Sequence, residues 1–388
     1  MKLDGPALAL DQWALAPEVV HLNHGSYGGC PASVIDAAIA MKRRLEAAPM
    51  RFFGTEWQGL VDRARAGLAT FLNAPAERLV FTPNATSGVA IALASCQLAA
   101  GDEILTTDHT YRACKNQLER LARERTARLV IVQVPLPFDP DAAVDAITRA
   151  VSTRTKIALL DHITSPTAVI MPLDRILPRL SGVHVVIDGA HAPGQIELDL
   201  TALSTLGVTY YAGNNHKWLC APKSTGFLYA SGRVKPLVTS HGASPDYGPA
   251  NRLHAELDWP GTYDPTAQLA VTDAIAALAA VDTMANIAAR NHRLAIALRD
   301  QVIDAMGGGR RLAPDSSYAA MAAIPIVLPP NVTPYQLTQR LLREDWELPI
   351  VDWPGQPLVR ISAHLYNSLA DGPPLVAKLR ELGVSLSP

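Results

Sequence analysis

Charge, cysteine and long apolar runs are all scarce in this chain. Of its 388 residues only 18% are charged, and the net charge is -2. The sequence therefore predicts neither a basic surface for nucleic acid nor a polybasic patch for a membrane. The four cysteines are widely spaced and form no CxxC pair: Cys30, Cys96, Cys114 and Cys220. We therefore expect no disulfide framework and favour a reducing compartment.

Several targeting and binding motifs are also missing. No run of 18 or more uncharged apolar residues predicts a membrane span, and the N-terminal segment lacks the apolar core of a signal peptide. No GxGxxG fingerprint of a nicotinamide dehydrogenase follows the early strands. We expect a cytoplasmic protein without nucleic-acid or membrane partners. We also expect no bound metal, because metal-ligand spacing is absent around His21, His184, His241, His254 and His292.

Apolar residues are abundant, and their pattern predicts an α/β fold. They make up 48% of the chain, enough to build two packed domains. Between residues 79 and 231, short apolar runs alternate with helix-length segments, which favours a mostly parallel, seven-stranded sheet buried on both faces. The predicted strands are Leu79–Thr82, Glu103–Thr107, Leu129–Val134, Lys156–Asp161, His184–Asp188, Val208–Tyr211 and Gly226–Ser231. The helices predicted between them are Ser87–Gln97, Arg112–Arg125 and Asp141–Val151.

The flanking segments have different patterns. Two helical patterns lie within 31–73, and one long alanine-rich helix is predicted over roughly 265–302. A β–α–β–α pattern follows at Met321–Val327, Pro334–Glu344, Leu358–Ser362 and 368–383. We therefore predict an N-terminal arm (1–30), a large α/β domain (31–262) and a small α+β domain (263–388) joined through the long helix.

Two polar segments follow predicted strands. HVVIDGAHAPG puts Asp188 at the end of one strand, and VTYYAGNNHKWLC puts Lys217 after another. Alone, each residue has an ordinary interpretation, as a helix cap or a surface lysine. Together they suit a pyridoxal 5'-phosphate (PLP) enzyme. A desolvated lysine can form an imine with the PLP aldehyde, and a carboxylate can hold the proton on the pyridine nitrogen.

A phosphate also needs a binding site. LVFTPNATSGVAIAL leads from a strand into a helix, and the N–H groups of that helix start, with the Thr86 hydroxyl, suit a phosphate dianion. The same sequence is also typical of an ordinary helix N-cap without a ligand.

Several ordered motifs together resemble the class V aminotransferase-like PLP enzymes, and most of all their isopenicillin N epimerase-like branch. They are LNHGSYGGCP, NATSG, VVIDGAHAPG, GNNHKWLCAPKSTGFLY, WPGT and LVRISAHLYNS, and they span roughly residues 20 to 370. The resemblance implies a type I PLP fold with a Schiff base on Lys217 and with Asp188 at the pyridine nitrogen. It implies cofactor contacts from Ala85, Thr86, His191, Asn214, His216 and Thr262.

Some implied roles depend on a second subunit or on departures from the family pattern. Thr262 matches a residue that reaches the phosphate of the neighbouring subunit, which implies a homodimer with shared active sites. Many relatives have serine where Asn214 stands. Many epimerase-like sequences have arginine where this chain has Tyr263, which puts a substrate contact from that position in doubt.

The resemblance also implies the substrate side of the site. Arg360 and Asn23 match substrate-binding positions, and a bidentate arginine would clamp the α-carboxylate of an amino acid. The residue that stacks on the cofactor comes from TTDHTYRAC, where desulfurase-like relatives favour His109 and epimerase-like relatives favour Tyr111. We favour His109 for stacking and Tyr111 as a proton donor.

The cofactor leaves the reaction open. Epimerisation at Cα of an amino acid is the leading hypothesis, with C–S lysis of a cysteine conjugate second and transamination third. A persulfide-forming desulfurase is disfavoured, since no cysteine follows Cys220. A PLP-fold binding or regulatory protein is the non-enzymatic alternative, and Lys217, Asp188 and Arg360 together speak against it.

Overall fold

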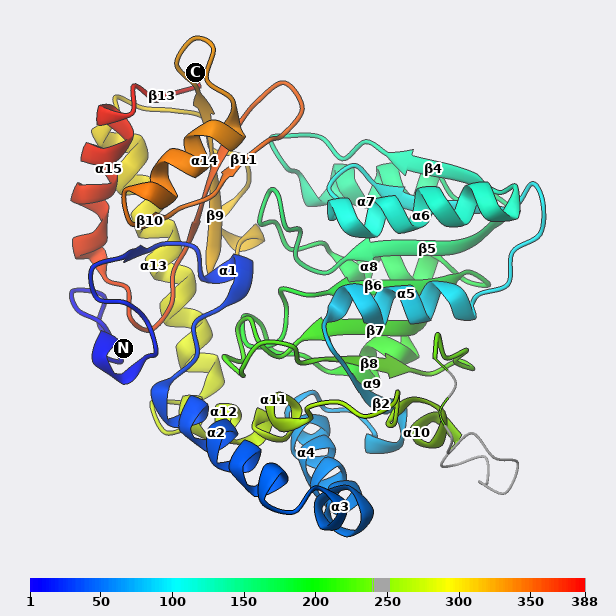
Figure 1. Ribbon diagram of the computed structural model, residues 1–388. Helices are drawn as coiled ribbons and strands as arrows, with labels where there is room; N and C mark the ends of the chain where they lie inside the picture. Colours follow the sequence, from blue (N-terminus) through cyan, green and yellow to red (C-terminus); the bar gives the residue numbers. More distant parts are fainter. Residues whose placement is uncertain (239, 241–251, 388) are drawn as a thin grey trace.

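A seven-stranded sheet forms the centre of the large part of the protein (Figure 1). The computed structural model describes residues 1–238, 240 and 252–387, so His241 lies outside the described residues. The strand order is β2-β8-β7-β6-β5-β3-β4, and β8 runs antiparallel to both of its neighbours while the other pairs are parallel. The strands are β2 (Leu79–Thr82), β3 (Glu103–Thr107), β4 (Arg128–Val132), β5 (Thr155–Asp161), β6 (His184–Gly189), β7 (Val208–Asn214) and β8 (Gly226–Ala230).

All seven predicted strands are confirmed. The largest difference is at β7, which continues to Asn214, beyond the predicted end at Tyr211. The small residues Ala212 and Gly213 allow this extension, because a side chain at Gly213 would collide with the ring of Phe227 on the neighbouring strand. The extension carries the chain to the lysine segment at the carboxyl edge of the sheet.

Helices cover both faces of the sheet, as the apolar strands require. α5 and α6 share one apolar cluster with Leu159, while α7 and α8 share another with Leu160, the next residue of β5. Successive residues of a strand point to opposite faces, so both sides of β5 are buried. The helices of this part are α2 (Ala32–Ala47), α4 (Trp57–Phe71), α5 (Ala85–Ser95), α6 (Arg112–Arg125), α7 (Pro140–Arg149), α8 (Leu173–Ile176) and α9 (Leu200–Thr205).

A four-stranded antiparallel sheet forms the smaller part, in the order β11-β12-β9-β13. The N-terminal arm joins this part, because β1 (Val20–His21) pairs in parallel with β10 (Trp346–Glu347). Figure 1 shows α13, α14 and α15 packed around this sheet. The elements are β9 (Met321–Val327), α14 (Pro334–Arg343), β11 (Ile350–Val351), β12 (Leu358–Ser362), α15 (Gly372–Glu381) and β13 (Ser385–Leu386).

The prediction of one long helix over 265–302 is wrong. The structure has three helices instead: α11 (Thr266–Leu269), α12 (Val271–Ala279) and α13 (Met284–Ala305). The chain bends by 73° between α12 and α13. The cause is the pair Asp282-Thr283, since the Thr283 hydroxyl caps α13 by accepting from the N–H of Asn286 and Asp282 accepts from the N–H of Thr283.

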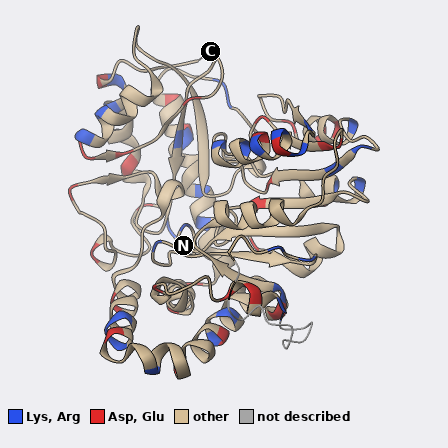
Figure 2. Cartoon of the chain, turned by 45° about the vertical axis from the view of Figure 1, so that its right-hand side comes forward, with Lys and Arg blue, Asp and Glu red and all other residues tan. Residues whose placement is uncertain are grey.

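The helices near the predicted domain boundary interlock across it. α2 and α4, which precede residue 262, pack against α11 and α12, which follow it. Among the described residues, no single helix is long and apolar enough to span a membrane; the bent pair Thr266–Ala279 and Met284–Ala305 meets those criteria only jointly. Figure 2 shows charges of both signs interspersed on the outer helices, as the near-zero net charge predicts.

Candidate active site

The carboxyl ends of β5, β6 and β7 meet at one edge of the sheet, where two connected hollows lie. The inner cavity has a volume of about 140 Å³ and is lined by Thr86, Asp161, Asp188, His191, Asn214, His216 and Lys217, among others. The outer cavity has a volume of about 420 Å³, and the residues that line it but not the inner cavity include Asp108, Arg112, Lys115, Asp352 and Trp353. Ser26, Tyr27, Tyr111, Ser165 and Lys217 line both. Ligands of parallel α/β sheets bind at such edges.

Lys217 is the basic group shared by the two cavities. Its Nζ lies 3.1 Å from Nε2 of His191. Burial first, and then the positive charge of Arg360, lower the pKa of Lys217 to about 7. A large fraction of the amine is therefore neutral near pH 7, which is the form that attacks an aldehyde.

Asp188 is a buried carboxylate held by two donors, with only 3% of its surface exposed. Oδ1 accepts a hydrogen bond from the N–H of Ala190 at 3.0 Å, and Oδ2 accepts from the thiol of Cys114 at 3.1 Å. Cys114 was not among the predicted site residues, since a lone cysteine within a helix pattern gives no sign of its partner. The structure therefore brings Asp188 and Lys217 into the same cavity and adds a thiol behind the aspartate.

The residues of the predicted phosphate site lie at the start of α5 and the end of β7. Ala85 begins α5, but its N–H donates to Oδ1 of Asn214 at 2.8 Å. This donor is therefore already used within the chain, and the predicted cofactor contact of Ala85 stays a prediction. The Asn214 side chain is likewise engaged through its oxygen, whereas the Thr86 hydroxyl lines the inner cavity.

His216 completes this end of the inner cavity. Its Nδ1 lies 2.8 Å from the carbonyl oxygen of Thr225, so Nδ1 carries the ring proton. Burial lowers the pKa of His216 to about 4. A bound dianion beside Nε2 would favour protonation and turn that nitrogen into a donor.

Arg360 is a fully buried guanidinium without a carboxylate partner in the described part of the chain. Nη1 donates to the carbonyl oxygen of Ser165 at 2.5 Å, and Nη2 donates to the hydroxyl of Ser26 at 3.0 Å and to Oδ1 of Asn23 at 3.3 Å. Burial lowers the pKa of Arg360 to about 10. A ligand carboxylate would stabilise a buried cation of this kind. Asn23 lines neither cavity, and substrate binding by Arg360 and Asn23 stays a prediction.

His109 and Tyr111 differ sharply in position. His109 is completely buried, with Nδ1 2.7 Å from the hydroxyl of Thr167 and Nε2 3.1 Å from the carbonyl oxygen of Val134. It lines neither cavity and packs edge-on against Trp353. This placement does not fit the stacking role that we favoured for His109. Tyr111 lines both cavities, and burial raises the pKa of its hydroxyl.

Thr262 is exposed and lines neither cavity. Its predicted reach into a neighbouring subunit stays a prediction. Tyr263 packs among aromatic residues instead: its ring lies 6.2 Å from that of Trp259, and its hydroxyl donates to Gln268.

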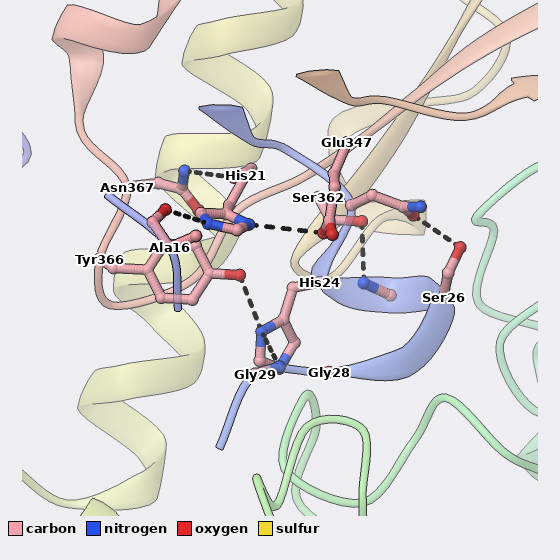
Figure 3. Close-up of polar contacts among 12 residues, drawn as sticks. Ala16, His21, His24, Ser26, Gly28, Gly29, Glu347, Ser362, Tyr366 and Asn367 are labelled. Atoms are coloured by element: carbon pink, nitrogen blue, oxygen red, sulfur yellow. Dashed lines mark hydrogen bonds and ion pairs between the residues drawn. The ribbon is translucent and has the colours of Figure 1, made fainter. Parts of the chain in front are cut away.

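The N-terminal segment contacts the lysine segment through His24, whose surroundings are shown in Figure 3. His24 accepts the N–H of Gly29 on Nδ1, so Nε2 carries the ring proton and donates to the carbonyl oxygen of Lys217 at 3.1 Å. The His24 ring stacks on His364 at 3.9 Å, and the Cys220 sulfur is near both. These three side chains lie within metal-ligand distance of one another, but the Nε2 proton leaves His24 without a free ligand atom on that side.

Pyridoxal phosphate fits the donors that this edge of the sheet leaves unused. Among the described side chains that line the two cavities, three buried polar atoms have no partner: Oδ2 of Asp161, Nδ1 of His191 and Nε of Arg360. Asp161 and Ser165, together with Ser26 and Tyr27, were missed at the sequence level. Their segments carry no spacing signal, because each comes to the site from a different part of the chain.

Comparison with known proteins places the chain in a family. Residues 29–345 match the model of "Aminotransferase class-V". The chain therefore belongs to the class V aminotransferase family and is an enzyme of that PLP-dependent family.

The names of individual relatives refer to different activities. The chain is 35% identical to an isopenicillin N epimerase of Amycolatopsis lactamdurans over 97% of its own length and 98% of that protein. It is 32% identical to a putative L-cysteine desulfhydrase of Oryza sativa subsp. japonica, covering 74% of this chain and 63% of that one. A solved cystine C-S lyase, C-DES, shares the fold with a TM-score of 0.82 at 21% identity, covering 96% of this chain and 99% of that one.

Proposed function

We propose that this enzyme binds PLP through Lys217 and inverts the configuration at Cα of an amino acid. The observation that carries the proposal is that Lys217 and Tyr111 both line the two connected cavities, next to the unpaired Arg360. The similarity to isopenicillin N epimerases over nearly the whole chain supports the same reaction. The bound cofactor would supply an electron sink that makes the Cα proton acidic.

The residues of the chain have distinct roles in this proposal. Arg360 holds the substrate carboxylate, with Ser26 and Asn23 orienting the guanidinium from the N-terminal segment. Asp188 holds the ring nitrogen of the cofactor in its protonated form. Lys217, whose pKa is near 7, accepts the Cα proton on one side.

Tyr111 supplies the second proton. Inversion requires a donor that differs from the base, and the Tyr111 side chain reaches the cavities from the start of α6 rather than from β7. Because burial raises the pKa of its hydroxyl, Tyr111 is protonated at neutral pH and suited to donate.

Incubation with a panel of L- and D-amino acids in D2O tests the reaction. Epimerisation predicts deuterium at Cα together with loss of chirality, starting from either enantiomer, and no exchange with the Lys217→Ala variant. Pyruvate and ammonia without Cα inversion would contradict the proposal and support the second candidate.

That second candidate is C–S lysis of a cysteine conjugate. The relatives named L-cysteine desulfhydrases favour it, as does the 420 Å³ outer cavity, which can hold a bulky sulfur substituent. In the described structure no cysteine lines either cavity, so the sulfur would leave without passing to a protein thiol. Conversion of the cofactor to pyridoxamine phosphate would instead indicate transamination.

We also propose a homodimer in which Thr262 contacts the phosphate of the neighbouring subunit. The exposure of Thr262 in the single chain is compatible with this contact. Analytical ultracentrifugation tests the dimer, and the PLP affinity of Thr262→Ala tests the contact. A monomer with full PLP affinity would contradict both.

A further inference from the structure

The inner cavity contains a second buried carboxyl group, Asp161, with no role in the function proposed above. Asp161 ends β5 and stands directly beside Asp188, its register partner on β6. Only 2% of its surface is exposed, and its Oδ2 has no hydrogen-bond partner among the described residues. It lines the same cavity as Lys217 and Asp188. A buried, unpartnered carboxyl oxygen at a ligand cavity is costly unless a ligand satisfies it.

The protein provides different polar partners for Asp188 and Asp161. Asp188 accepts from the N–H of Ala190 and from the thiol of Cys114. Asp161 forms no ion pair with any Lys or Arg in the described chain. The two cations nearest the cavities have other neighbours, since Lys217 Nζ contacts His191 and Arg360 contacts Ser165 and Ser26.

The groups facing Asp161 oppose its ionisation on balance. Burial, and then the negative charge of Asp188, raise the pKa of Asp161 well above the usual range. The Thr110 hydroxyl and the Tyr111 N–H act in the other direction but do not offset these effects. Cys114, packed on the same pair from α6, is a neutral thiol whose own pKa is raised by burial and by both carboxyl groups.

We propose that Asp161 is a neutral carboxylic acid that donates a hydrogen bond to an acceptor oxygen of the group bound in the inner cavity. Asp188 is then the only negatively charged member of the pair. The Asp161 O–H points to a ligand oxygen that would otherwise lack a hydrogen-bond donor. Two adjacent carboxyl groups in a site of low polarity divide their roles in this way because both cannot ionise cheaply. The protonation state does not depend on the reaction; the identity of the acceptor rests on the proposed PLP site.

Isotope-edited infrared spectroscopy on protein labelled with ¹³C-carboxyl aspartate tests the protonation state. We expect a protonated-carboxyl band at pH 7 in the full-length protein, with and without PLP. Asp161→Asn should remove it, whereas the matched surface variant Asp273→Asn should retain it. A wild-type spectrum with only ionised carboxylate bands at pH 7 would overturn the proposal. This outcome can be read from the wild-type protein alone.

The same band identifies the acceptor. A shift to lower frequency on adding PLP alone means that the cofactor accepts the proton, and a shift that appears only after an amino acid is added means that the substrate does. Both results support a donor role for Asp161. A band that does not move in either step overturns it. Neither result depends on whether the turnover is inversion or lysis, so the fate of the reaction proposal is measured separately.

A pH titration of the visible absorbance of lysine-linked PLP gives a second measure. Asp161→Asn replaces one neutral donor with another and should move the midpoint by less than about 0.3 pH unit. If Asp161 were ionised, losing its charge would lower the midpoint by about one unit or more, because a nearby anion stabilises the protonated imine. A displacement of that size would contradict the proposal.

Discussion

The inner and outer cavities differ in the elements that line them and in how far those elements are exposed to solvent. The inner cavity is lined by strand ends whose polar groups are buried, such as Asp161, Asp188 and His191. The outer cavity is lined by the start of α6 and by the β11–β12 connection, where Arg112 and Asp352 are exposed. Strand ends hold charged groups at fixed distances in a medium of low polarity, while the outer wall meets water and carries both signs of charge.

One fold can support several reactions when the residues around a shared site vary. Relatives named epimerases and relatives named cysteine desulfhydrases both resemble this chain over most of its length. Changes in the outer wall alter which substrate enters and where protons are delivered, whereas changes at the sheet edge affect the shared cofactor chemistry.

The largest effect is expected from removing the shared base in the inner cavity. Lys217→Ala should abolish the visible absorbance of lysine-linked PLP and lower turnover by at least about 10⁴-fold, because it removes both the covalent link and the proton acceptor. Absorbance spectra and turnover measured with the same PLP-saturated samples check this. A variant that retains the band would break the assignment of the inner cavity as the cofactor site.

The next effect concerns Arg360, the buried cation that lines the outer cavity. Arg360→Met should lower kcat/KM by about 30-fold or more, mainly through KM, because the substrate carboxylate loses a buried charged partner. Arg360→Lys should recover only part of the loss, since lysine cannot form the bidentate contact. The rate of hydrogen exchange at Cα in D2O, measured with an amino acid and with its decarboxylated amine, separates lost carboxylate binding from a general loss of activity: only exchange in the amino acid should be affected.

Tyr111 and His109 form a matched pair, since one lines the cavities and the other does not. Tyr111→Phe should lower the rate of inversion by about 100-fold while exchange of the Cα proton by Lys217 persists, because only the second proton donor is lost. His109→Gln should leave the ratio of inversion to exchange unchanged. Both rates come from one experiment in D2O, and equal loss of inversion and exchange in Tyr111→Phe would contradict the two-base assignment.

The pKa of Lys217 predicts how cofactor loading depends on pH. The neutral amine reacts, so the rate of PLP incorporation into the apo protein should rise about tenfold per pH unit below pH 7 and level off above it. Arg360→Met should shift this profile to higher pH, because it removes a positive charge that lowers the pKa of Lys217. Stopped-flow absorbance records the rates, and a profile still rising at pH 9 would contradict the buried-amine account.

The smallest effect is expected on the outer wall. Lys115→Ala should change KM by less than about threefold for a small amino acid, because a half-exposed charge contributes little in water. A larger change for substrates with an extended acidic side chain than for alanine would show that the outer cavity selects the distal group. Equal values of KM across such a series would remove that distinction between the cavities.

The sequence by itself determined the sheet, the family and the meeting of Asp188 and Lys217 at one edge of the sheet. Strand positions follow from local apolar periodicity. Asp188 lies at the carboxyl end of one strand and Lys217 follows the end of another, so their meeting at one edge follows from parallel topology. The sequence analysis predicted one helix over 265–302 and did not detect the bend between α12 and α13. That bend depends on a local cap at Asp282-Thr283, which apolar periodicity does not register.

Only the tertiary structure decided which neighbouring residues face the ligand. His109 and Tyr111 are two positions apart, yet the turn before α6 buries the first and directs the second into both cavities. Asp161 gained its place beside Asp188 through strand pairing, and Arg360 gained Ser26 and Ser165 through contacts between segments more than a hundred residues apart. Such contacts depend on how finished elements pack, and packing is set by the whole chain rather than by local pattern.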